Sequence, residues 1–588
     1  MAAGDQFFLP EADAGDQTKF RAPQRPGVSV TPLIDGIATF KAMELAIASA
    51  KTSVHIAVWT MLGNLPLQSP GPVKAALQAS GMTGVRVTQW DELFAAVAGL
   101  GVETRIIISD FDGILQSKLH RAAWEAYRDL RAAGKKVKDA DLEVMCSLHN
   151  AHLSPPTLKL EFGIMPWLLG RLIALLNNLD KADGVSRINT MPRLWPFVNY
   201  DKTTKTFSRS SANLLVWPAS HHQKICIVDG ATAFCGGLDP QPGRLDTPNH
   251  GGQGWHDTHV QVDGALAADL ERNFVARWNA EGTIFNTFIA GAATAGKTLN
   301  ADPVTTITAT ASQAHGSPGT ATGQLLRTVA STTVSMAIPI NLRQDVKQAV
   351  IQAIAQAQSF IYIENQYVRD AQLLTWLTAT PATVAIILVL PIAPEEMAAV
   401  VDPHDPFSGP DPITMKGVFI EDQLIKDLRA ALPGRFGAYS MVQKKQANDR
   451  THKTNSAGSF QIYVHSKTMI VDDQFATIGS ANLNPRSHLV DTEANIGWYD
   501  PAGVKKLRLA LWREMLGNPP DIETWTAASY VAKWDKIATD NAGTTKELQR
   551  KGFIVPHDVT TFPGADDPDI PVEYVELTDQ DPVGAVLV

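Results

Sequence analysis

The most constraining feature of this sequence is a short pattern of polar residues that occurs twice. Residues 221–230 read HHQKICIVDG and residues 464–473 read VHSKTMIVDD. In each copy a histidine, a lysine two positions later and an aspartate seven positions after the histidine surround a short apolar run, which is typical of a buried strand. Because alternate residues of a strand point to one face, each histidine projects together with its lysine. A chain that repeats this pattern is expected to consist of two similar halves.

The segments that precede the two copies also correspond. Residues 28–61 read as a helix with one apolar face followed by an alternating apolar strand, and residues 345–368 repeat this order. Each half then continues with another helix and another apolar strand before it reaches its His-Lys segment. Alternating helices and apolar strands are typical of α/β layers. The sequence therefore predicts an α/β protein built from two similar lobes.

Differences in length between the halves indicate the domain organisation. An Ala-, Thr- and Gly-rich stretch places the junction near residue 320, so we predict a first lobe at 28–320 and a second lobe at 321–530. The first half is the longer one, and we expect it to contain a large insertion within 113–215 that begins with a charged helix. Residues 1–27 and 531–588 have no counterpart in the repeat and are predicted to be terminal extensions. The second extension ends in an acidic, Pro-containing tail at 560–584, which we expect to wrap along the surface or to be partly disordered.

The composition is that of an ordinary globular protein, with 45% apolar and 19% charged residues and a formal net charge of −9. This negative charge argues against a protein whose main task is to hold nucleic acid, because such proteins carry a basic surface. The three cysteines, Cys146, Cys226 and Cys235, imply no disulfide framework and are expected to be buried free thiols.

The sequence contains no run of about 18 apolar residues, so no transmembrane helix is expected. Its first residues lack a basic segment followed by an apolar one, and therefore do not read as a secretory signal. We expect a protein that is cytoplasmic as synthesised, with export by a leaderless route as the alternative.

Each copy of the motif is followed at the same distance by a segment that contains glycine. The sequence GGLD at 236–239 begins seven residues after Asp229, and GSAN at 479–482 begins seven residues after Asp472. Glycine lets the backbone approach closely to whatever the His-Lys pairs hold. Asp229 and Asp472 themselves lie at the far end of the apolar run, and we predict a structural role for them, such as a turn or a salt bridge.

Taken together, the two HxKxxxxD segments and their glycine-containing followers resemble the phospholipase D superfamily, over roughly 28–530. The segments IYIENQYV at 361–368 and GWHDTHVQVDG at 254–264 are similar to segments of its true phospholipase D branch. The resemblance implies two similar, pseudo-symmetric α/β/α sandwich lobes with the active site between them. It also implies cleavage of a phosphodiester through a covalent phosphohistidine, without a metal.

The residue types of the two motifs suit this chemistry. Lys224 and Lys467 can clamp the oxygens over which a phosphodiester transition state spreads its charge. An imidazole can act as nucleophile or as proton donor, because its ordinary pKa of about 6.5 lies near working pH. The resemblance implies that His222 is the nucleophile and that His465 protonates the leaving alcohol and then activates water. The predicted phosphate-binding residues are Asp239, Ser480 and Asn482.

Each histidine is expected to have a carboxylate that fixes its tautomer. The family places an acid downstream of each motif, and Asp257 and Glu493 fit that pattern, 35 residues after His222 and 28 residues after His465. Asp491 competes with Glu493 but lies on the opposite face of a strand.

Other polar residues near the motifs are interpreted as bystanders. These are His221, which alternates away from its neighbour, together with His256 and His488. The acidic stretch 402–411 reads as a surface loop rather than a calcium site, because of its prolines and irregular spacing. We therefore expect no metal and no cofactor.

The resemblance favours lipid hydrolysis, with phosphatidylcholine or phosphatidylethanolamine as substrate and phosphatidic acid and the free head group as products. Transfer to a primary alcohol is also expected. The alternatives are a phosphodiesterase of the same superfamily that acts on nucleic acid, and a catalytically idle lipid-binding protein. We expect a monomer that meets its phospholipid at a membrane or micelle surface through the apolar stretch 162–179 or the Trp- and Pro-containing stretch 191–197.

Overall fold

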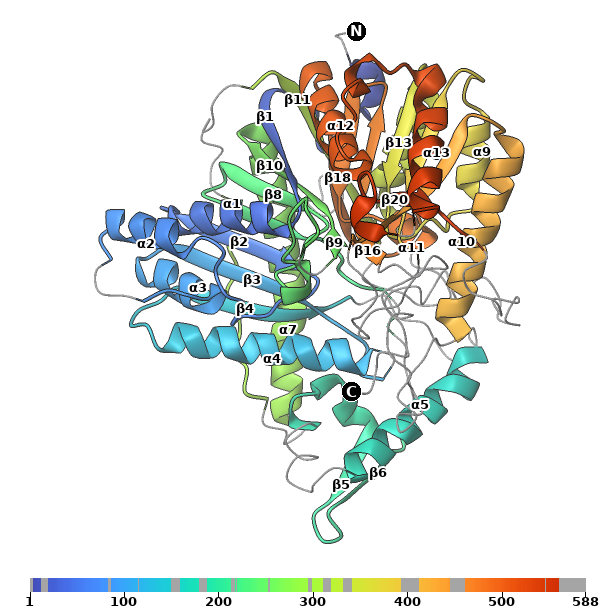
Figure 1. Cartoon of the computed structure of the whole chain (residues 1–588). Helices are drawn as coiled ribbons and strands as arrows, with labels where there is room; N and C mark the ends of the chain where they lie inside the picture. Colours follow the sequence, from blue (N-terminus) through green and yellow to red (C-terminus); the bar gives the residue numbers. More distant parts are fainter. Residues whose placement is uncertain are drawn as a thin grey trace.

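The structure is a computed structural model of the whole chain (Figure 1). It describes residues 4–11, 20–82, 86–114, 116–149, 159–178, 188–212, 217, 219–251, 254–294, 299–309, 319–330, 341–392, 412–444, 461–544 and 546–559.

The first lobe contains a sheet of seven strands in the order β1-β10-β8-β7-β2-β3-β4. The bounds of these strands are β1 Arg25–Ile34, β2 Ser53–Val58, β3 Glu103–Asp110, β4 Leu142–Leu148, β7 Ile225–Val228, β8 Thr232–Gly236 and β10 Thr258–Asp263. Strands β2, β3 and β4 are parallel to one another, and the remaining pairs are antiparallel. The parallel strands are buried along nearly their whole length, as expected for strands that helices cover on both faces.

Helices flank this sheet. They are α1 Gly36–Ala48, α2 Pro70–Ala79, α3 Trp90–Gly99, α4 Ser117–Lys135 and α7 Ala265–Thr294. His55 of β2 stacks on Phe274 of α7, and its neighbours Val54 and Ile56 turn to the opposite face, because side chains alternate along a strand. The connections through α3 and α4 run in the same direction along the sheet, so a common handedness places both helices on one face.

The second lobe repeats the arrangement with the strand order β11-β19-β18-β17-β13-β14-β15. The bounds are β11 Ala321–Ala330, β13 Phe360–Glu364, β14 Ala385–Val389, β15 Phe436–Val442, β17 Thr468–Val471, β18 Phe475–Gly479 and β19 Glu493–Tyr499. Again three parallel strands, β13, β14 and β15, are followed across the sheet by antiparallel ones. The prediction of an α/β protein with two similar lobes is confirmed.

Further elements complete the second lobe. Its helices are α8 Asp345–Gln356, α9 Gln372–Thr378, α10 Pro412–Ala431, α11 Pro485–Leu489, α12 Pro501–Leu516 and α13 Ala527–Ala542. Three short strands extend the sheet, β12 Asn341–Gln344 beside β11, and β16 Gln461–Val464 and β20 Ile554–Pro556 beside β15. The remaining short elements are the 3-10 turns η1 Asp5–Phe7, η4 Pro242–Arg244, η6 Ile522–Thr524 and η7 Glu547–Gln549 and the strand β9 Trp255–His256.

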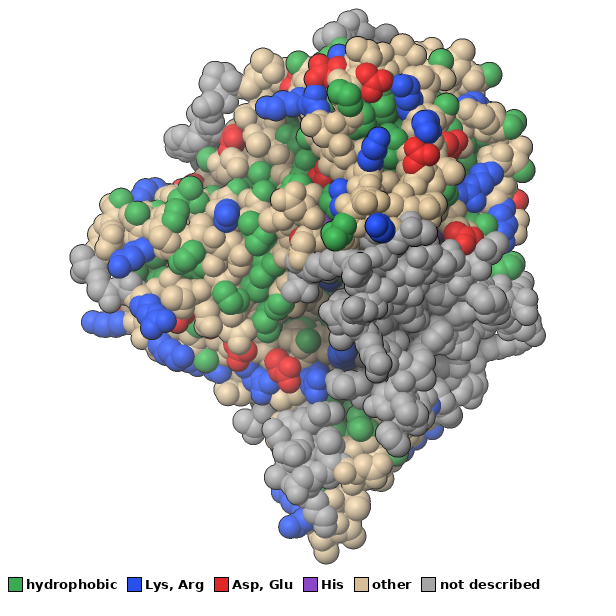
Figure 2. Space-filling model, viewed as in Figure 1, with side chains coloured by type: hydrophobic (Ala, Val, Ile, Leu, Met, Phe, Trp, Pro, Cys, Tyr) green, Lys and Arg blue, Asp and Glu red, His purple; other side chains and the backbone are tan. Residues whose placement is uncertain are grey.

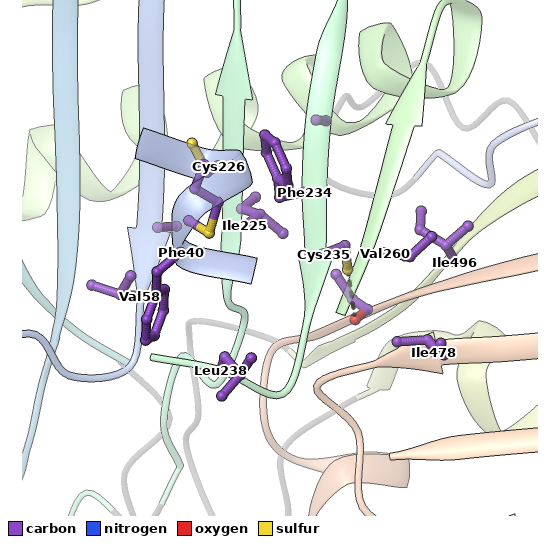
Figure 3. Close-up of a cluster of buried hydrophobic side chains, with 14 of the residues drawn as sticks. Phe40, Val58, Ile225, Cys226, Phe234, Cys235, Leu238, Val260, Ile478 and Ile496 are labelled. Atoms are coloured by element: carbon purple, nitrogen blue, oxygen red, sulfur yellow. Dashed lines mark hydrogen bonds between the residues drawn. The ribbon is translucent and has the colours of Figure 1, made fainter. Parts of the chain in front are cut away.

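The two lobes share a buried interface. Strand β1 pairs with β11, so the two sheets are continuous, and β8 and β10 contact β18 and β19. Figure 3 shows Val260 of the first lobe beside Ile496 and Ile478 of the second, and the thiol of Cys235 donates to the carbonyl of Ala494 across the same interface. All three cysteines are buried free thiols, as predicted.

Three boundaries differ from the sequence-based prediction. Helix α4 is not part of an insertion, because it connects β3 to β4 within the first lobe and packs on both strands. The second lobe continues beyond residue 530, since α13 buries Trp534 against it and β20 pairs with β15. The predicted acidic tail at 560–584 lies outside the described residues. Near the other end, Phe7 stacks on Phe475 of the second lobe at 5.0 Å.

The insertion proper follows β4. It contains α5 Lys159–Asn178, the 3-10 turn η3 Pro192–Phe197 and the two-stranded hairpin of β5 Val198–Asp201 and β6 Thr206–Arg209. These elements share a small hydrophobic core of their own, which includes Leu172, Leu194 and Phe207. Figure 1 shows the hairpin projecting away from both lobes.

Among the described residues, no helix is long and apolar enough to span a bilayer.

Candidate active site

The two motif histidines lie at the same end of their respective sheets. His222 precedes β7, which runs antiparallel beside the end of the parallel strand β2, and His465 precedes β17, which lies in the same way beside β13. Only 7% of His222 and 6% of His465 is exposed, so both imidazoles are almost enclosed. The charges of His222 and Lys224 act on His465, so the two motifs lie near one another, and we call the region that they share the cleft.

Asp229 and Asp472 lie at the opposite end of the motif strands, away from the histidines. The carboxylate of Asp229 accepts hydrogen bonds from the backbone N–H groups of residues 51–53, and that of Asp472 accepts from those of residues 358–360. Both residues have a positive φ, 55° and 56°, which aspartate tolerates better than most residues. Each carboxylate therefore closes the turn that leads into the central strand of its lobe.

The imidazole of His222 is held by a carboxylate from the second lobe. Its Nδ1 lies 3.0 Å and 3.1 Å from the two carboxylate oxygens of Glu493. The hydroxyls of Ser480 and Ser487 donate to the same carboxylate, Ser487 at 2.6 Å. These donors and the nearby imidazole outweigh burial and lower the pKa of Glu493 from its ordinary value.

The imidazole of His465 is held in the same way by a carboxylate from the first lobe. Its Nδ1 lies 2.7 Å from Asp257, whose other oxygen accepts a hydrogen bond from the Thr258 N–H at 2.8 Å. No hydroxyl donates to Asp257 within the described part of the chain, and burial raises its pKa to about 6. Trp255 packs against the His465 ring, with 5.0 Å between ring centroids.

This pairing crosses the lobes, which the sequence did not predict. We expected each acid to serve the histidine of its own half, and the structure gives each acid to the histidine of the other half. The cause lies in the backbone: His465 N–H donates to the carbonyl of His256 at 2.8 Å, and His222 N–H donates to the carbonyl of Thr492 at 2.9 Å. The residue before each acid therefore accepts a hydrogen bond from the motif histidine of the other lobe. We call each histidine with its carboxylate a half-site, and each half-site needs both lobes.

The two lysines lie in the cleft with different partners. Lys224 Nζ lies 3.2 Å from Asp239 Oδ2, and Asp239 also accepts from the Trp59 N–H at 2.9 Å. Lys467 Nζ donates to the amide oxygen of Gln366 at 2.8 Å. Burial is the main cause that lowers the pKa of Lys467 to about 7. The pKa of His465 also falls well below its ordinary value because of burial and of positive neighbours that include Lys467.

The three predicted phosphate-binding residues have different surroundings. Asp239 pairs with Lys224 and accepts hydrogen bonds from backbone N–H groups. The Ser480 hydroxyl donates to Glu493. Neither side chain is therefore placed to bind a phosphate. Asn482 lines a small cavity with Lys467, and within the described residues its buried Oδ1 has no hydrogen-bond partner. Of the three, Asn482 fits the predicted role best.

Sequence reasoning missed several residues of the cleft. Gln366 occupies the position after β13 that Trp59 occupies after β2, so the internal repeat contained a signal for both. Arg244 stacks on Trp255, with 3.5 Å between the guanidinium carbon and the ring centroid, and its charge contributes to lowering the pKa of His465. Nothing in the motif spacing pointed to Arg244.

The expected bystanders His221 and His488 have partners of their own. His221 Nδ1 lies 3.1 Å from Thr492 Oγ1, and His488 Nδ1 lies 2.8 Å from Asp370. His488 nevertheless lines the small cavity that Lys467 and Asn482 share. Asp491, the competitor of Glu493, pairs with Arg486. The acidic stretch 402–411 lies outside the described residues.

His256 is not a bystander. It belongs to a buried cluster with Asp35, His250 and Glu514, in which one potential ligand atom from each residue lies within 4.8 Å of the others. The carboxylate oxygen Asp35 Oδ2 has no hydrogen-bond partner among the described residues. The same groups pair with one another, since His250 and His256 both contact Glu514, at 3.1 Å and 2.9 Å. Two imidazoles and two carboxylates could also hold a divalent cation, and the expectation that the chain binds no metal stays a prediction.

This cluster lies directly behind one half-site. Asp35 Oδ1 accepts a hydrogen bond from the backbone N–H of Asp257 at 3.2 Å. His250 and His256 have raised pKa values, that of His250 about 9, because hydrogen bonds and nearby carboxylates outweigh their burial. Positive charge in the cluster, from protons or from a cation, therefore lies next to the backbone segment that positions Asp257.

Comparison with known proteins agrees with this geometry. The family model described as phospholipase D matches residues 251–393 and 435–544. The chain is 27% identical over 404 residues to phospholipase D alpha 3 of Arabidopsis thaliana, which covers 50% of this chain and 48% of that protein. It is 28% identical over 459 residues to phospholipase D delta of the same plant, covering 57% and 51%. The chain thus spans about half the length of the curated relatives it matches.

Among solved structures, phosphatidylserine synthase of Haemophilus influenzae covers 90% of this chain and 98% of its own, with a TM-score of 0.46 and 11% identity. The family assignment rests on the matches in sequence. The region that the family model matches includes Asp257 and the second His-Lys motif. The chain therefore belongs to the phospholipase D superfamily, on its true phospholipase D branch.

Proposed function

We propose that the protein hydrolyses the distal phosphodiester of glycerophospholipids to phosphatidic acid and a free head group. The observation that carries this proposal is the crossed arrangement of the cleft, in which two histidines, each held by the other lobe's carboxylate, face a site with two lysines. Phosphatidylcholine and phosphatidylethanolamine are the proposed substrates, and the plant relatives named phospholipase D support the choice of a lipid.

In the first step the unprotonated Nε2 of His222 attacks phosphorus. Its Nδ1–H is directed at Glu493, which offsets the positive charge that the ring gains when the N–P bond forms. The P–O bond to the head group breaks, and protonated His465 supplies the proton to the leaving alkoxide. The head group departs as an alcohol, and the phosphatidyl group stays on His222.

In the second step the phosphatidyl group is transferred to water. Neutral His465, held by Asp257, removes a proton from water as the oxygen attacks phosphorus and the N–P bond breaks. Phosphatidic acid leaves, and both imidazoles return to their starting states. A primary alcohol in place of water gives a transphosphatidylation product by the same route.

The lysines supply the positive charge for this reaction. Lys224 and Lys467 can hold the two non-bridging oxygens of the phosphodiester and stabilise the charge that grows on them in the transition state. An anionic phosphate also raises the pKa of a neighbouring imidazole or ammonium group. Binding of substrate is therefore expected to restore the proton that His465 needs as an acid and to keep Lys467 charged.

No step of this chemistry is assigned to a metal. A divalent cation bound by Asp35, His250, His256 and Glu514 would supply positive charge behind Asp257, and these residues would act by fixing the segment that carries this carboxylate. The monomeric state and the cytoplasmic location remain predictions.

The first experiment measures choline or ethanolamine release from phospholipid micelles in excess EDTA, for wild type, His222→Ala and His465→Ala. Release that survives the chelator and is lost in both variants is the expected result. Lys505→Ala, an exposed residue on α12, serves as the control variant. Circular dichroism melting shows that the variants are folded.

Two results would redirect the proposal. Cleavage of a diester nucleotide without release from any lipid would move the protein to the nuclease alternative. Silence on both substrates, with intact lipid binding, would favour the idle lipid-binding protein.

A further inference from the structure

The charge of this chain is unevenly distributed. Residues 117–210 contain 15 Lys and Arg against 9 Asp and Glu, which is a net charge of +6. The whole chain carries −9, so the remainder carries −15. An anionic partner is attracted by the basic region and repelled by the acidic remainder of the molecule. The uneven charge therefore points to an anionic partner that binds at the basic region.

Part of this basic region is the outer surface of α4. Its exposed or half-buried side chains include Lys118, Arg121, Arg128 and Lys135. Figure 2 shows blue side chains along the edge of the first lobe where α4 runs, with red ones between them. Arg121 pairs with Glu125 and Lys135 with Asp302, so the charge of α4 is partly compensated. The face of the helix that packs on the lobe is apolar, with Trp124, Tyr127 and Leu130 buried.

The other part is the β5–β6 hairpin of the insertion. Phe207 is buried against the insertion's own core, so the polar residues of the hairpin face outward. Lys202, Lys205 and Arg209 are exposed, and none forms an ion pair with a described residue. The one nearby acid, Asp201, has a carboxylate oxygen engaged by the N–H groups of Thr203 and Thr204 within the turn.

The insertion is anchored at the cleft end of the first sheet. It begins after β4, whose end lies at the same edge as the ends of β2 and β3, and it returns to the chain just before His222. The Arg193 guanidinium donates to Asp110 at the end of β3 at 2.9 Å, and Asp110 also pairs with His120 of α4. These buried contacts fix the insertion to the edge from which the cleft opens.

The structure also changes which part of the insertion can meet a lipid surface. The stretch 191–197 was expected to be an apolar docking loop, but Met191, Leu194 and Phe197 are buried in the insertion's core. Leu172 and Leu176 of α5 point into the same core. The side chains of residues 161–165, 167 and 168 lie outside the described ones, so docking through 162–179 stays a prediction. The exposed charges of the described hairpin are mostly cationic.

We propose that the β5–β6 hairpin docks the protein on an anionic lipid surface. Among polyanions, a lipid surface is favoured because it presents the proposed substrate. The inference therefore rests on the proposed function. Each basic side chain near an anionic bilayer contributes about 1 kcal/mol of binding, or roughly fivefold in the partition coefficient.

The test compares two double variants that remove the same charge. Lys202→Gln/Lys205→Gln changes the hairpin, and Lys505→Gln/Lys506→Gln changes an exposed pair on α12 of the second lobe. Binding is measured by co-sedimentation with vesicles of phosphatidylcholine alone and of phosphatidylcholine with phosphatidylglycerol. The hairpin variant is expected to bind the mixed vesicles roughly tenfold to thirtyfold more weakly than wild type. The α12 variant is expected to bind like wild type, and added salt should weaken wild-type binding.

A soluble short-chain phosphatidylcholine below its micelle concentration separates this inference from the proposed function. Both double variants are expected to hydrolyse it at the wild-type rate, because neither pair of residues lies in the cleft. Equal vesicle binding by all three proteins, or a hairpin effect on an oligonucleotide and not on vesicles, would overturn the docking inference and leave the hydrolase proposal standing. Failure of wild type to hydrolyse the soluble lipid, with charge-dependent vesicle binding retained, would overturn the hydrolase proposal instead.

Discussion

The two half-sites of the cleft have matching backbones and different electrostatics. In one, His222 faces Glu493, a carboxylate with a lowered pKa that two serine hydroxyls support. In the other, His465 faces Asp257, a buried carboxylate with its pKa raised to about 6. The internal repeat thus reproduces the positions of the groups but not their proton affinities.

The lysines differ in the same sense. Lys224 has a carboxylate partner in Asp239, whereas Lys467 has the neutral amide of Gln366 and a pKa lowered to about 7. A duplicated site that performs two successive steps needs one group that keeps its charge and one that can exchange a proton. The difference between the halves indicates how one symmetrical frame can serve two chemical roles.

The largest expected effect comes from removing the crossed carboxylates. Glu493→Gln and Asp257→Asn are each expected to lower kcat by roughly a thousandfold to ten-thousandfold, because the imidazole loses the partner that fixes its tautomer. If the two steps are divided as proposed, pre-steady-state head-group release separates the variants. Glu493→Gln should suppress the burst, whereas Asp257→Asn should leave a covalent intermediate that hydrolyses slowly. Identical kinetics in the two variants would contradict the claim that the two half-sites act in different steps.

Substitutions of the two lysines are expected to differ in how much they lower the unfolding free energy of the protein, rather than in how much they lower its activity. Lys224→Met leaves the buried Asp239 carboxylate without its ammonium partner and should cost about 3 kcal/mol of unfolding free energy. Lys467→Met leaves only a neutral amide and should cost less than half of that. Urea unfolding measures both, and Lys224→Met/Asp239→Leu should regain stability without regaining activity. A larger loss for Lys467→Met would contradict the assigned partners.

The pH dependence of kcat/KM should show both groups of the second half-site. Below about pH 6 Asp257 takes up a proton and can no longer support a charged His465, so the rate falls on the acid side. Above about pH 7 Lys467 loses its charge in the free enzyme, and the rate falls again. The profile is therefore bell-shaped and narrow, and Lys467→Arg, if active, should extend it to higher pH. An acid limb that persists unchanged in Asp257→Asn would assign that limb to another group.

The smallest expected effect concerns the cluster behind Asp257. Zinc or manganese, which accept imidazole together with carboxylate ligands, should raise the melting temperature of wild type by a few degrees, because a ligand that binds only the folded state stabilises it. Glu514→Gln removes one ligand and should abolish the shift, while Glu523→Gln, an exposed acid outside the cluster, should retain it. A shift of equal size in all three proteins would show that the cation binds elsewhere.

Much of the frame could be predicted from the sequence because the motif occurs twice. The short apolar runs predicted the motif strands, and the two-residue period of a strand predicted that each histidine projects beside its lysine. The crossing of the acids could not be predicted, because it depends on how the two lobes pack, and the backbone contacts of His256 and Thr492 have no signal in spacing.

Other residues escaped prediction for the same reason. Asp35, the pair His250 and His256, and Glu514 come from three distant segments that only the folded chain brings together. Strand β4 was assigned to an insertion because the insertion was inferred from the greater length of the first half, and a difference in length does not show where the extra residues begin. Ser480 was predicted from its place in the repeat to bind phosphate, and its burial behind Glu493 could be seen only in three dimensions.

The most direct test of the crossed two-histidine site is to locate the covalent intermediate. The protein is quenched in alkali during turnover of a phospholipid, digested and analysed by mass spectrometry for a phosphatidyl or phosphoryl adduct on histidine. We predict the adduct on His222 in wild type, more of it in Asp257→Asn and none in His222→Ala. Full turnover with no adduct on any histidine would contradict the covalent mechanism, and an adduct on His465 would reverse the roles of the two lobes.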